Sequence, residues 1–267
     1  MQKMLEKYMA DCDFSIYAYD HEGILFALNE HNVQDGACVL KVFIMLEFFR
    51  RVYLGDIRED VLLEVTAENE ATGAGVVKFL SNGIKVKAID LVELMVTISD
   101  HMAANLLIDY LVIDNINKTI KDYGFTQTKL FKKYLVPHEK YVGEISAFDY
   151  ARFYEMLDNN LFFDGLFCER MKEILKGQRY KDFLAEPLSV YDEYIDMQSK
   201  TGKVDGKSFE VPGNSCMNDG GICLTTKGKY YVAFLAEIHH DAAVDLELIK
   251  NIMHSISKEI MERYLLR

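Results

Sequence analysis

Cys38 and Lys41 stand three positions apart at the start of an almost wholly apolar run, residues 39–49. Lys41 and Glu47 are the only charged residues in that run. Burial penalises an ammonium group, so a lysine in such a run needs a partner, and residues three apart on a helix share one face. The spacing therefore favours an amine that faces and activates a thiol nucleophile. Taken alone the pattern is common, and the lysine could equally extend outward to solvent.

Two further polar motifs follow later in the chain: Ser99-Asp100-His101 with Asn105 close behind, and Lys200-Thr201-Gly202. Each has a structural explanation. Serine and aspartate are favoured N-cap residues, so capping a helix that begins at Met102 could be the sole role of the first motif. The second is a common tripeptide where a strand meets a turn. The two motifs indicate chemistry only in combination with the cysteine–lysine pair.

That combination resembles the class A serine β-lactamases and their penicillin-binding relatives, which carry S-x-x-K, S-D-N and K-T-G on three elements that meet in one cleft. The resemblance covers the chain from about Asp13 onward and includes the stretches 72–75, 89–91, 217–222 and 228–232. It implies one β-lactamase-like domain over residues 1–267, of the α/β (α+β) class. A mainly antiparallel sheet flanked by the terminal helices would comprise residues 1–37 and 191–267, and a helical subdomain residues 38–190.

The chain departs from the family at three places. Cys38 replaces the serine nucleophile, and His101 stands where the second motif usually has asparagine. The family activates its deacylating water with a glutamate between the second and third motifs, but residues 129–134 contain no carboxylate. Glu139 and Glu144 lie nearby without the family's E-x-x-x-N context. We therefore expect acylation chemistry without efficient β-lactam hydrolysis.

Four residues are assigned catalytic roles from their chemistry and from the resemblance. Cys38 is expected to be the nucleophile, in the first turn of a helix whose unpaired N–H groups favour a thiolate. Lys41 is expected to act as its base or charge partner. The resemblance implies that Ser99 relays a proton to the leaving group and that Lys200 tunes Ser99 electrostatically.

The third motif and the residue after it, Thr201, Gly202 and Lys203, are expected to bind substrate. By resemblance, Thr201 hydrogen-bonds a substrate carboxylate. The resemblance also implies an oxyanion hole formed by the backbone N–H groups of Cys38 and Lys203.

Polar residues after Ser99 complete the expected binding set. His101 could occupy only the asparagine's place, or it could carry protons near pH 7. Asn105 is expected to order the loop around Ser99 through its amide. Asp100 is expected to be structural rather than catalytic.

Composition excludes several classes of protein. Half of the 267 residues are hydrophobic and 27% are charged, which suits a globular protein with a sizeable core. The net charge of −12, with both signs interspersed, argues against a nucleic-acid partner. No run approaches the roughly 20 apolar residues of a membrane span. Residues 1–10 lack an apolar signal core, so we expect a cytoplasmic protein with a small-molecule or peptide substrate, or a secreted one if a signal peptide has been removed.

The five cysteines are odd in number and form no C-x-x-C pair, which fits free thiols in a reducing compartment. Cys216 and Cys223 are expected to be small core residues. His239 and His240 are expected to face solvent, and no group of residues has convincing metal-ligand spacing. We therefore expect neither a metal nor a cofactor.

Turn residues and periodicity predict strands at 13–19, 23–28, 197–204, 220–225 and 230–238. Helices are predicted at 39–54, 89–98, 102–111, 113–123, 147–157, 166–175 and 243–266. Strands near both ends with helices between them predict a single sheet assembled from the two ends of the chain. The strands at 23–28 and 230–238 should therefore belong to the same sheet.

Three functions are compatible with these residues. The first is a cysteine-dependent acyl-transfer enzyme that acts on an amide, peptide or ester through a thioester. The second is a serine-type β-lactamase or peptidase whose nucleophile has been altered. The third is a non-catalytic protein that keeps the cleft as a ligand pocket. The sequence carries no pattern that identifies the acyl donor.

Overall fold

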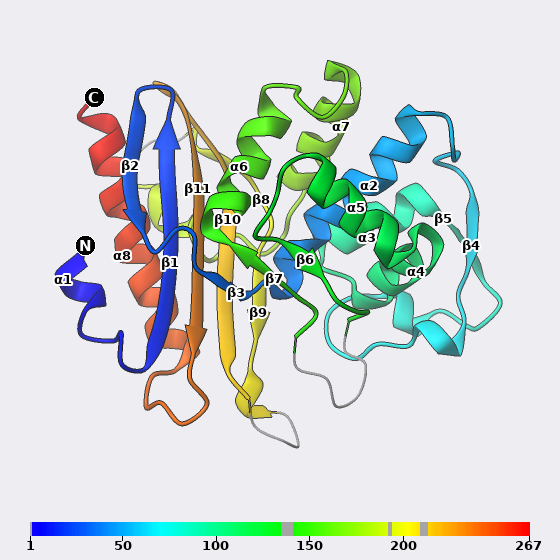
Figure 1. Ribbon diagram of the computed structural model, residues 1–267, viewed down its shortest axis with the longest axis horizontal. Coiled ribbons are helices and arrows are strands. Elements are labelled where there is room, and N and C mark those ends of the chain that lie inside the picture. The colour runs from blue at the N-terminus through cyan, green and yellow to red at the C-terminus, as the bar shows by residue number, and fades with distance from the viewer. Residues whose placement is uncertain (1, 135–140, 192–193, 209–212) are drawn as a thin grey trace.

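A six-stranded sheet forms the centre of the molecule, and both ends of the chain contribute strands to it (Figure 1). The computed structural model describes residues 2–134, 141–191, 194–208 and 213–267. The strands of the sheet are β1 Cys12–Asp20, β2 Gly23–Leu28, β8 Asp196–Ser199, β9 Gly202–Val204, β10 Ser215–Thr225 and β11 Gly228–Ile238. Their order is β2-β1-β11-β10-β8, β9 also pairs with β10, and every pairing is antiparallel. The predicted fold class, including one sheet shared by β2 and β11, is confirmed.

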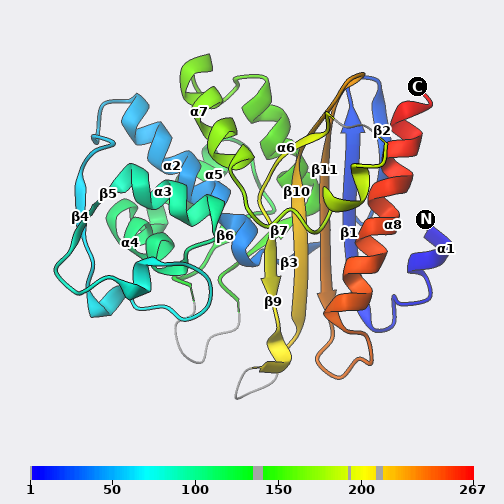
Figure 2. The same cartoon turned by 180° about the vertical axis from the view of Figure 1, so that it is seen from behind.

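Helices cover both faces of this sheet. Along β11, Tyr231, Ala233 and Leu235 belong to a hydrophobic cluster that includes α6 (Ala147–Asp158). The residues between them belong to a second cluster with α8 (Leu246–Leu265): Tyr230, Val232, Phe234 and Ala236. Successive side chains of a strand point to opposite faces, so the near-continuous hydrophobic run of β11 requires a helix on each side. Figure 2 shows α8 along one face, with the short α1 (Gln2–Leu5) near it.

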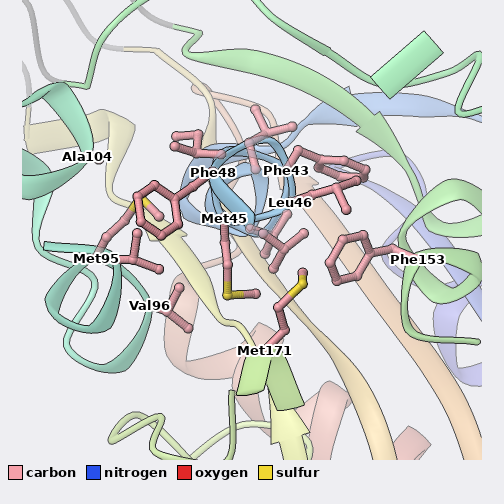
Figure 3. Packing of buried hydrophobic residues seen from close by; sticks show 14 of the residues in the cluster. Phe43, Met45, Leu46, Phe48, Met95, Val96, Ala104, Phe153 and Met171 are labelled. Atoms are coloured by element: carbon pink, nitrogen blue, oxygen red, sulfur yellow. The ribbon is translucent and has the colours of Figure 1, made fainter. Parts of the chain in front are cut away.

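The helical part of the molecule is built around α2 (Lys41–Tyr53). Its neighbours are α3 Ala88–Thr97, α4 His101–Leu111, α5 Ile113–Asp122 and α7 Gly165–Lys176. Every residue of α2 from Lys41 to Phe49 is buried. Figure 3 shows Phe43, Met45 and Phe48 of α2 packed among side chains of the surrounding elements. Full burial of a large apolar side chain contributes about 1.5–3 kcal/mol, so this packing fixes α2 and the turn that precedes it.

Five short strands outside the main sheet were not predicted. They are β3 Val33–Asp35, β6 Lys129–Leu130 and β7 Gly143–Ser146 in one sheet, and β4 Leu62–Glu64 with β5 Lys85–Lys87 in another. Segments of two to four residues, several of them charged, carry no readable period-two pattern. The β3–β7 pair is important for the site because the Gly36 N–H donates to the Gly143 carbonyl at 3.0 Å, just ahead of Cys38.

The predicted strand 197–204 is interrupted at Lys200 and Thr201, although β8 and β9 keep one register against β10. The Lys200 N–H still donates to the Gly220 carbonyl at 3.1 Å. The reciprocal bond is replaced, because the Tyr150 hydroxyl donates to the Lys200 carbonyl and the Asp219 carboxylate accepts from the Gly220 N–H at 2.9 Å. Two buried side chains therefore take the place of one ladder hydrogen bond.

The C-terminal helix starts later than predicted, at Leu246, because the Asp245 carboxylate accepts from the Leu248 N–H at 2.8 Å and caps the helix. Across the described ranges, no helix combines the length and the apolar character needed to cross a membrane.

Glu47 is a fully buried carboxylate on α2, and two groups hold it. Arg50 donates to both of its oxygens, with Nε at 2.7 Å and Nη2 at 3.1 Å, and the Thr119 hydroxyl donates at 2.6 Å. A buried charge that loses its partner is strongly destabilising.

Replacing Arg50 with leucine should therefore lower the free energy of unfolding by about 3 kcal/mol. The matched control is Arg51→Leu at the neighbouring, half-buried position, which should cost less than about 1 kcal/mol. Urea denaturation followed by circular dichroism measures both variants. Equal losses would show that the Glu47–Arg50 pair does not stabilise α2.

Candidate active site

Cys38 lies in a single 3₁₀ turn, Ala37–Leu40, directly ahead of α2. The sequence predicted the first turn of an α-helix, which is wrong in type, since the α-helix begins at Lys41. The Asp35 carboxylate accepts from the Ala37 N–H at 2.9 Å, and Ala37 has a φ of 43°. An aspartate that bonds the backbone two residues on makes a tight turn. Packing against the following helix leaves Cys38 only 7% exposed.

Lys41 is fully buried, and its ammonium reaches three acceptors. Nζ lies 3.6 Å from Cys38 Sγ, 2.7 Å from the Ser99 carbonyl oxygen and 3.1 Å from Ser99 Oγ. A carbonyl oxygen can only accept, so Lys41 is a donor in that bond. The three contacts match the three hydrogens of an ammonium group, which satisfies a buried cation.

Ser99 joins the two lysines of the site. Its Oγ accepts from Lys200 Nζ at 3.1 Å as well as from Lys41, and Lys200 Nζ also donates to the Thr201 carbonyl at 2.7 Å. Ser99 has a φ of 58°, a left-handed conformation that costs a non-glycine residue roughly 1–3 kcal/mol. The contacts made by both lysines hold the residue in this conformation.

Asp100 caps α4 rather than facing the thiol. One of its oxygens accepts from the Ala103 N–H at 2.9 Å, and the other accepts from Val76 and Val77 at 2.6 and 2.9 Å. Gly75, with a φ of 116°, packs so closely that a Cβ there would lie 2.2 Å from the Asp100 carboxyl carbon. Asp100 thus has the structural arrangement that the sequence favoured.

His101 contacts the thiol from a second direction. Its Nε2 lies 3.3 Å from Cys38 Sγ, and its Nδ1 lies 3.0 Å from the Thr72 carbonyl oxygen. Since that oxygen can only accept, Nδ1 carries a proton, and Nε2 is left to exchange one with the sulfur. The histidine therefore does more than replace an asparagine.

Tyr134 is a residue of the site that the sequence reasoning missed. Its ring lies 4.4 Å from Lys41 Nζ and stacks on His101 with 5.6 Å between the ring centroids. Its hydroxyl donates to the Ala37 carbonyl at 3.2 Å. Burial raises the pKa of this phenol well above its ordinary value. The signal in the sequence that could have indicated Tyr134 was an aromatic residue at the end of the carboxylate-free stretch 129–134.

Asn105 orders a different loop from the one predicted. Its Oδ1 accepts from the Tyr134 N–H at 2.7 Å, and its Nδ2 donates to the carbonyls of Tyr134 and Asn69 at 3.2 and 3.3 Å. The buried amide is engaged by backbone groups, so its expected role in the Ser99 loop is corrected to positioning Tyr134, and its role in substrate binding stays a prediction. Glu139 lies outside the described residues, and Glu144 lies in β7, opposite Asp35 of β3.

The third motif lies against the cysteine turn. A Cβ on Gly202 would be 3.0 Å from the Cys38 nitrogen and 3.2 Å from the Val39 nitrogen. Gln178 Nε2 donates to Thr201 Oγ1 at 3.4 Å. The Lys203 side chain is exposed, and its backbone lies in β9, opposite Met217. The three motifs predicted from the sequence therefore converge on Cys38.

The electrostatics of the site favour a thiolate. Burial alone would raise the pKa of Cys38, but Lys41, His101 and Lys200 reverse this effect and hold that pKa well below its ordinary value. Burial lowers the pKa of Lys41, and it lowers the pKa of Lys200 to about 7, with the Cys38 thiolate opposing both changes. The anion and the two cations therefore stabilise one another's charged forms.

The described residues contain no group of three or more His, Cys, Asp or Glu side chains that could hold a metal ion. His239 is partly exposed and contacts the Asp13 carboxylate at 3.0 Å. Cys216 and Cys223 are buried in the sheet, as expected of small core residues.

Comparisons with known proteins agree with this geometry. A family model described as the beta-lactamase enzyme family matches residues 1–264. A β-lactamase from Sphaerobacter thermophilus DSM 20745 is 23% identical, with a TM-score of 0.81, and the match covers 99% of this chain and 94% of that one. PBP-A is 18% identical, with a TM-score of 0.86 and coverage of 100% and 96%. A class A representative from Bacteroides cellulosilyticus DSM 14838 is 19% identical, with a TM-score of 0.81 and coverage of 98% and 96%.

A search of curated proteins found no significant match. The solved structures share the fold with this chain at identities too low to carry activity across. The family model, in contrast, spans nearly every residue, including all three motifs. The chain belongs to the beta-lactamase enzyme family.

Proposed function

We propose that the protein is an acyl-transfer enzyme in which Cys38 attacks an amide, peptide or ester and holds the acyl group as a thioester. The observation that carries this proposal is the placement of Cys38 Sγ 3.6 Å from Lys41 Nζ and 3.3 Å from His101 Nε2. Thiolates are nucleophilic, and adjacent cations are the usual means of generating one at neutral pH.

The acylation step follows from the residues around the sulfur. The thiolate attacks the carbonyl carbon, and a C–S bond forms while the carbonyl oxygen takes up negative charge. Backbone N–H groups of Cys38 and Lys203 are the proposed donors to that oxyanion. As the tetrahedral intermediate collapses, the leaving group departs with the bonding electrons and takes up a proton. Thr201 is proposed to bind a substrate carboxylate beside it, while Lys200 tunes Ser99 electrostatically.

The second half of the reaction is proposed to use an amine rather than water. Tyr134 occupies the site beside Lys41 and His101, and burial raises its pKa, so it stays a neutral phenol that cannot accept a proton from water. Among the described residues, no carboxylate hydrogen-bonds to Cys38 Sγ, whose partners are Lys41 and His101. A thioester is readily attacked by amines, which need less activation than water. Transfer to an amine, with slow hydrolysis as a side reaction, is the outcome that this environment supports.

Selective labelling tests for an activated thiol. Substoichiometric iodoacetamide at pH 7 should modify Cys38 before the other cysteines, because burial raises the pKa of Cys12, Cys168 and Cys216. Peptide mass spectrometry locates the label. Preferential modification of any other cysteine would favour a non-catalytic ligand-binding protein.

Lys41→Ala should slow alkylation of Cys38 more at pH 7 than at pH 9. The cation lowers the thiol's pKa, so its loss reduces the thiolate fraction at pH 7, whereas at higher pH the thiol ionises more fully without help. Alkylation rates from intact-protein mass spectrometry measure the effect, with Lys118→Ala on the exposed face of α5 as the control. If Lys41→Ala matches the parent at both pH values, Lys41 does not activate the sulfur.

Benzylpenicillin should acylate Cys38 slowly and be released more slowly still, since residues 129–134 hold no carboxylate in the place of the family's deacylating glutamate. A stable mass increase without measurable turnover is the expected result. Hydrolysis at about 10 per second or faster would contradict it.

Cys38→Ser, assayed with a chromogenic cephalosporin, tests the alternative of a serine hydrolase with an altered nucleophile. Efficient turnover by that variant would favour the alternative.

A further inference from the structure

We infer that His101 is a second catalytic residue, which pairs with Cys38 and carries the proton of acyl transfer from the thiol to the leaving group. This inference rests on the proposed function and adds a role that the resemblance to serine enzymes does not supply. In those enzymes the second motif usually has asparagine at this position, and an amide cannot transfer a proton in this way.

The geometry meets both requirements for a proton carrier. A base must lie within reach of the nucleophile, and a third group must orient the base. His101 Nε2 is 3.3 Å from Cys38 Sγ, and the Thr72 carbonyl fixes Nδ1 as the protonated nitrogen at 3.0 Å. The stacked ring of Tyr134 restrains the imidazole plane. The imidazole is therefore held with its reactive nitrogen toward the sulfur.

The other titratable groups around the sulfur are less suited to this task. Lys41, from α2, already donates to two atoms of Ser99 as well as to Cys38. Lys200 donates to Ser99 Oγ and to the Thr201 carbonyl. Ser99 Oγ accepts hydrogen bonds from both lysines. If its hydroxyl gave a proton to the leaving group, one of the lysines would have to supply the replacement. His101 is the group that contacts the sulfur and has a single exchangeable proton at the contacting atom.

The proton balance closes over one cycle. The thiol proton moves to Nε2 as the thiolate forms, and the thiolate makes a C–S bond with the acyl carbon. The bond to the leaving group then breaks, and Nε2 returns the proton to that group. In the second half, an acceptor amine attacks the thioester, gives its proton to Nε2 and forms a C–N bond as the C–S bond breaks. The departing sulfur regains the thiolate–imidazolium pair.

Two acetyl esters that differ only in leaving group test the inference. Phenolate is a poorer leaving group than p-nitrophenolate and depends more on protonation. His101→Asn should slow acylation of Cys38 by phenyl acetate by about 100-fold or more, and acylation by p-nitrophenyl acetate much less. Ser99→Ala should slow both esters by similar factors. Intact-protein mass spectrometry gives the rate of each variant and of the parent with each ester, and His240→Asn at an exposed position is the matched control.

Further measurements separate proton transfer from a structural role. Circular dichroism and the melting temperature establish that each variant folds, and His101→Gln provides a second variant should His101→Asn not fold. Added imidazole should partly restore acylation of His101→Ala by phenyl acetate. Leaving-group dependence in Ser99→Ala but not in His101→Asn would overturn the inference and assign the proton to Ser99.

Failure of the proposed function would give a different result from failure of the His101 inference. If neither ester acylates Cys38 in the parent protein, the acyl-transfer proposal fails. The pairing is then tested by iodoacetamide, which needs no proton for its leaving group. His101→Asn should slow alkylation at pH 7 by about tenfold relative to the parent. Equal rates would show that the imidazole does not stabilise the thiolate.

Discussion

Two buried ammonium groups that share one serine oxygen are the constraint around which this site is organised. Lys41 and Lys200 are both fully buried, and each lies 3.1 Å from Ser99 Oγ. Like charges so close together in a protein interior destabilise each other unless an anion is near. The Cys38 thiolate supplies that anion, and the carbonyls of Ser99 and Thr201 supply further acceptors. Three elements distant in sequence must therefore be held within hydrogen-bond distance.

The helical part and the sheet each hold one part of this site in place. The buried residues of α2 fix Cys38 and Lys41. Lys200 is fixed by β10 together with Tyr150 and Asp219. Tyr150 and Asp219 take over one ladder bond beside Lys200, which anchors its backbone without a regular strand. Asp100 ties the start of α4 to the loop at Val76 and so maintains the strained conformation of the adjacent Ser99. Lys200 and Ser99 thus each depend on a buried polar contact made by neighbouring residues.

The sequence predicted the fold and the meeting of the three motifs because these depend on long apolar patterns and on residue order. It did not predict which neighbour each polar side chain contacts. The amide of Asn105 was expected at Ser99 but bonds the backbone at Tyr134, and the tyrosine itself was overlooked in a stretch read only for carboxylates. Contacts of this kind depend on the path of irregular loops, where no period exists. The 3₁₀ turn at Cys38 follows a local hydrogen bond from the Ala37 N–H to Asp35, and the interruption at Lys200 follows two side-chain hydrogen bonds made by Tyr150 and Asp219. Neither leaves a periodic signal in the sequence.

The shared position of the two lysines has a consequence for the proton count of the site. Both ammonium groups are stabilised by the negative sulfur, and burial already lowers the pKa of Lys200 to about 7. Under the proposed chemistry, thioester formation converts that sulfur into a neutral atom. The two cations then face each other across Ser99 without the charge of the sulfur, so the acylated site favours loss of one lysine proton. Acylation would in this way favour a neutral lysine amine beside the thioester, and the second half-reaction would have a base in addition to His101.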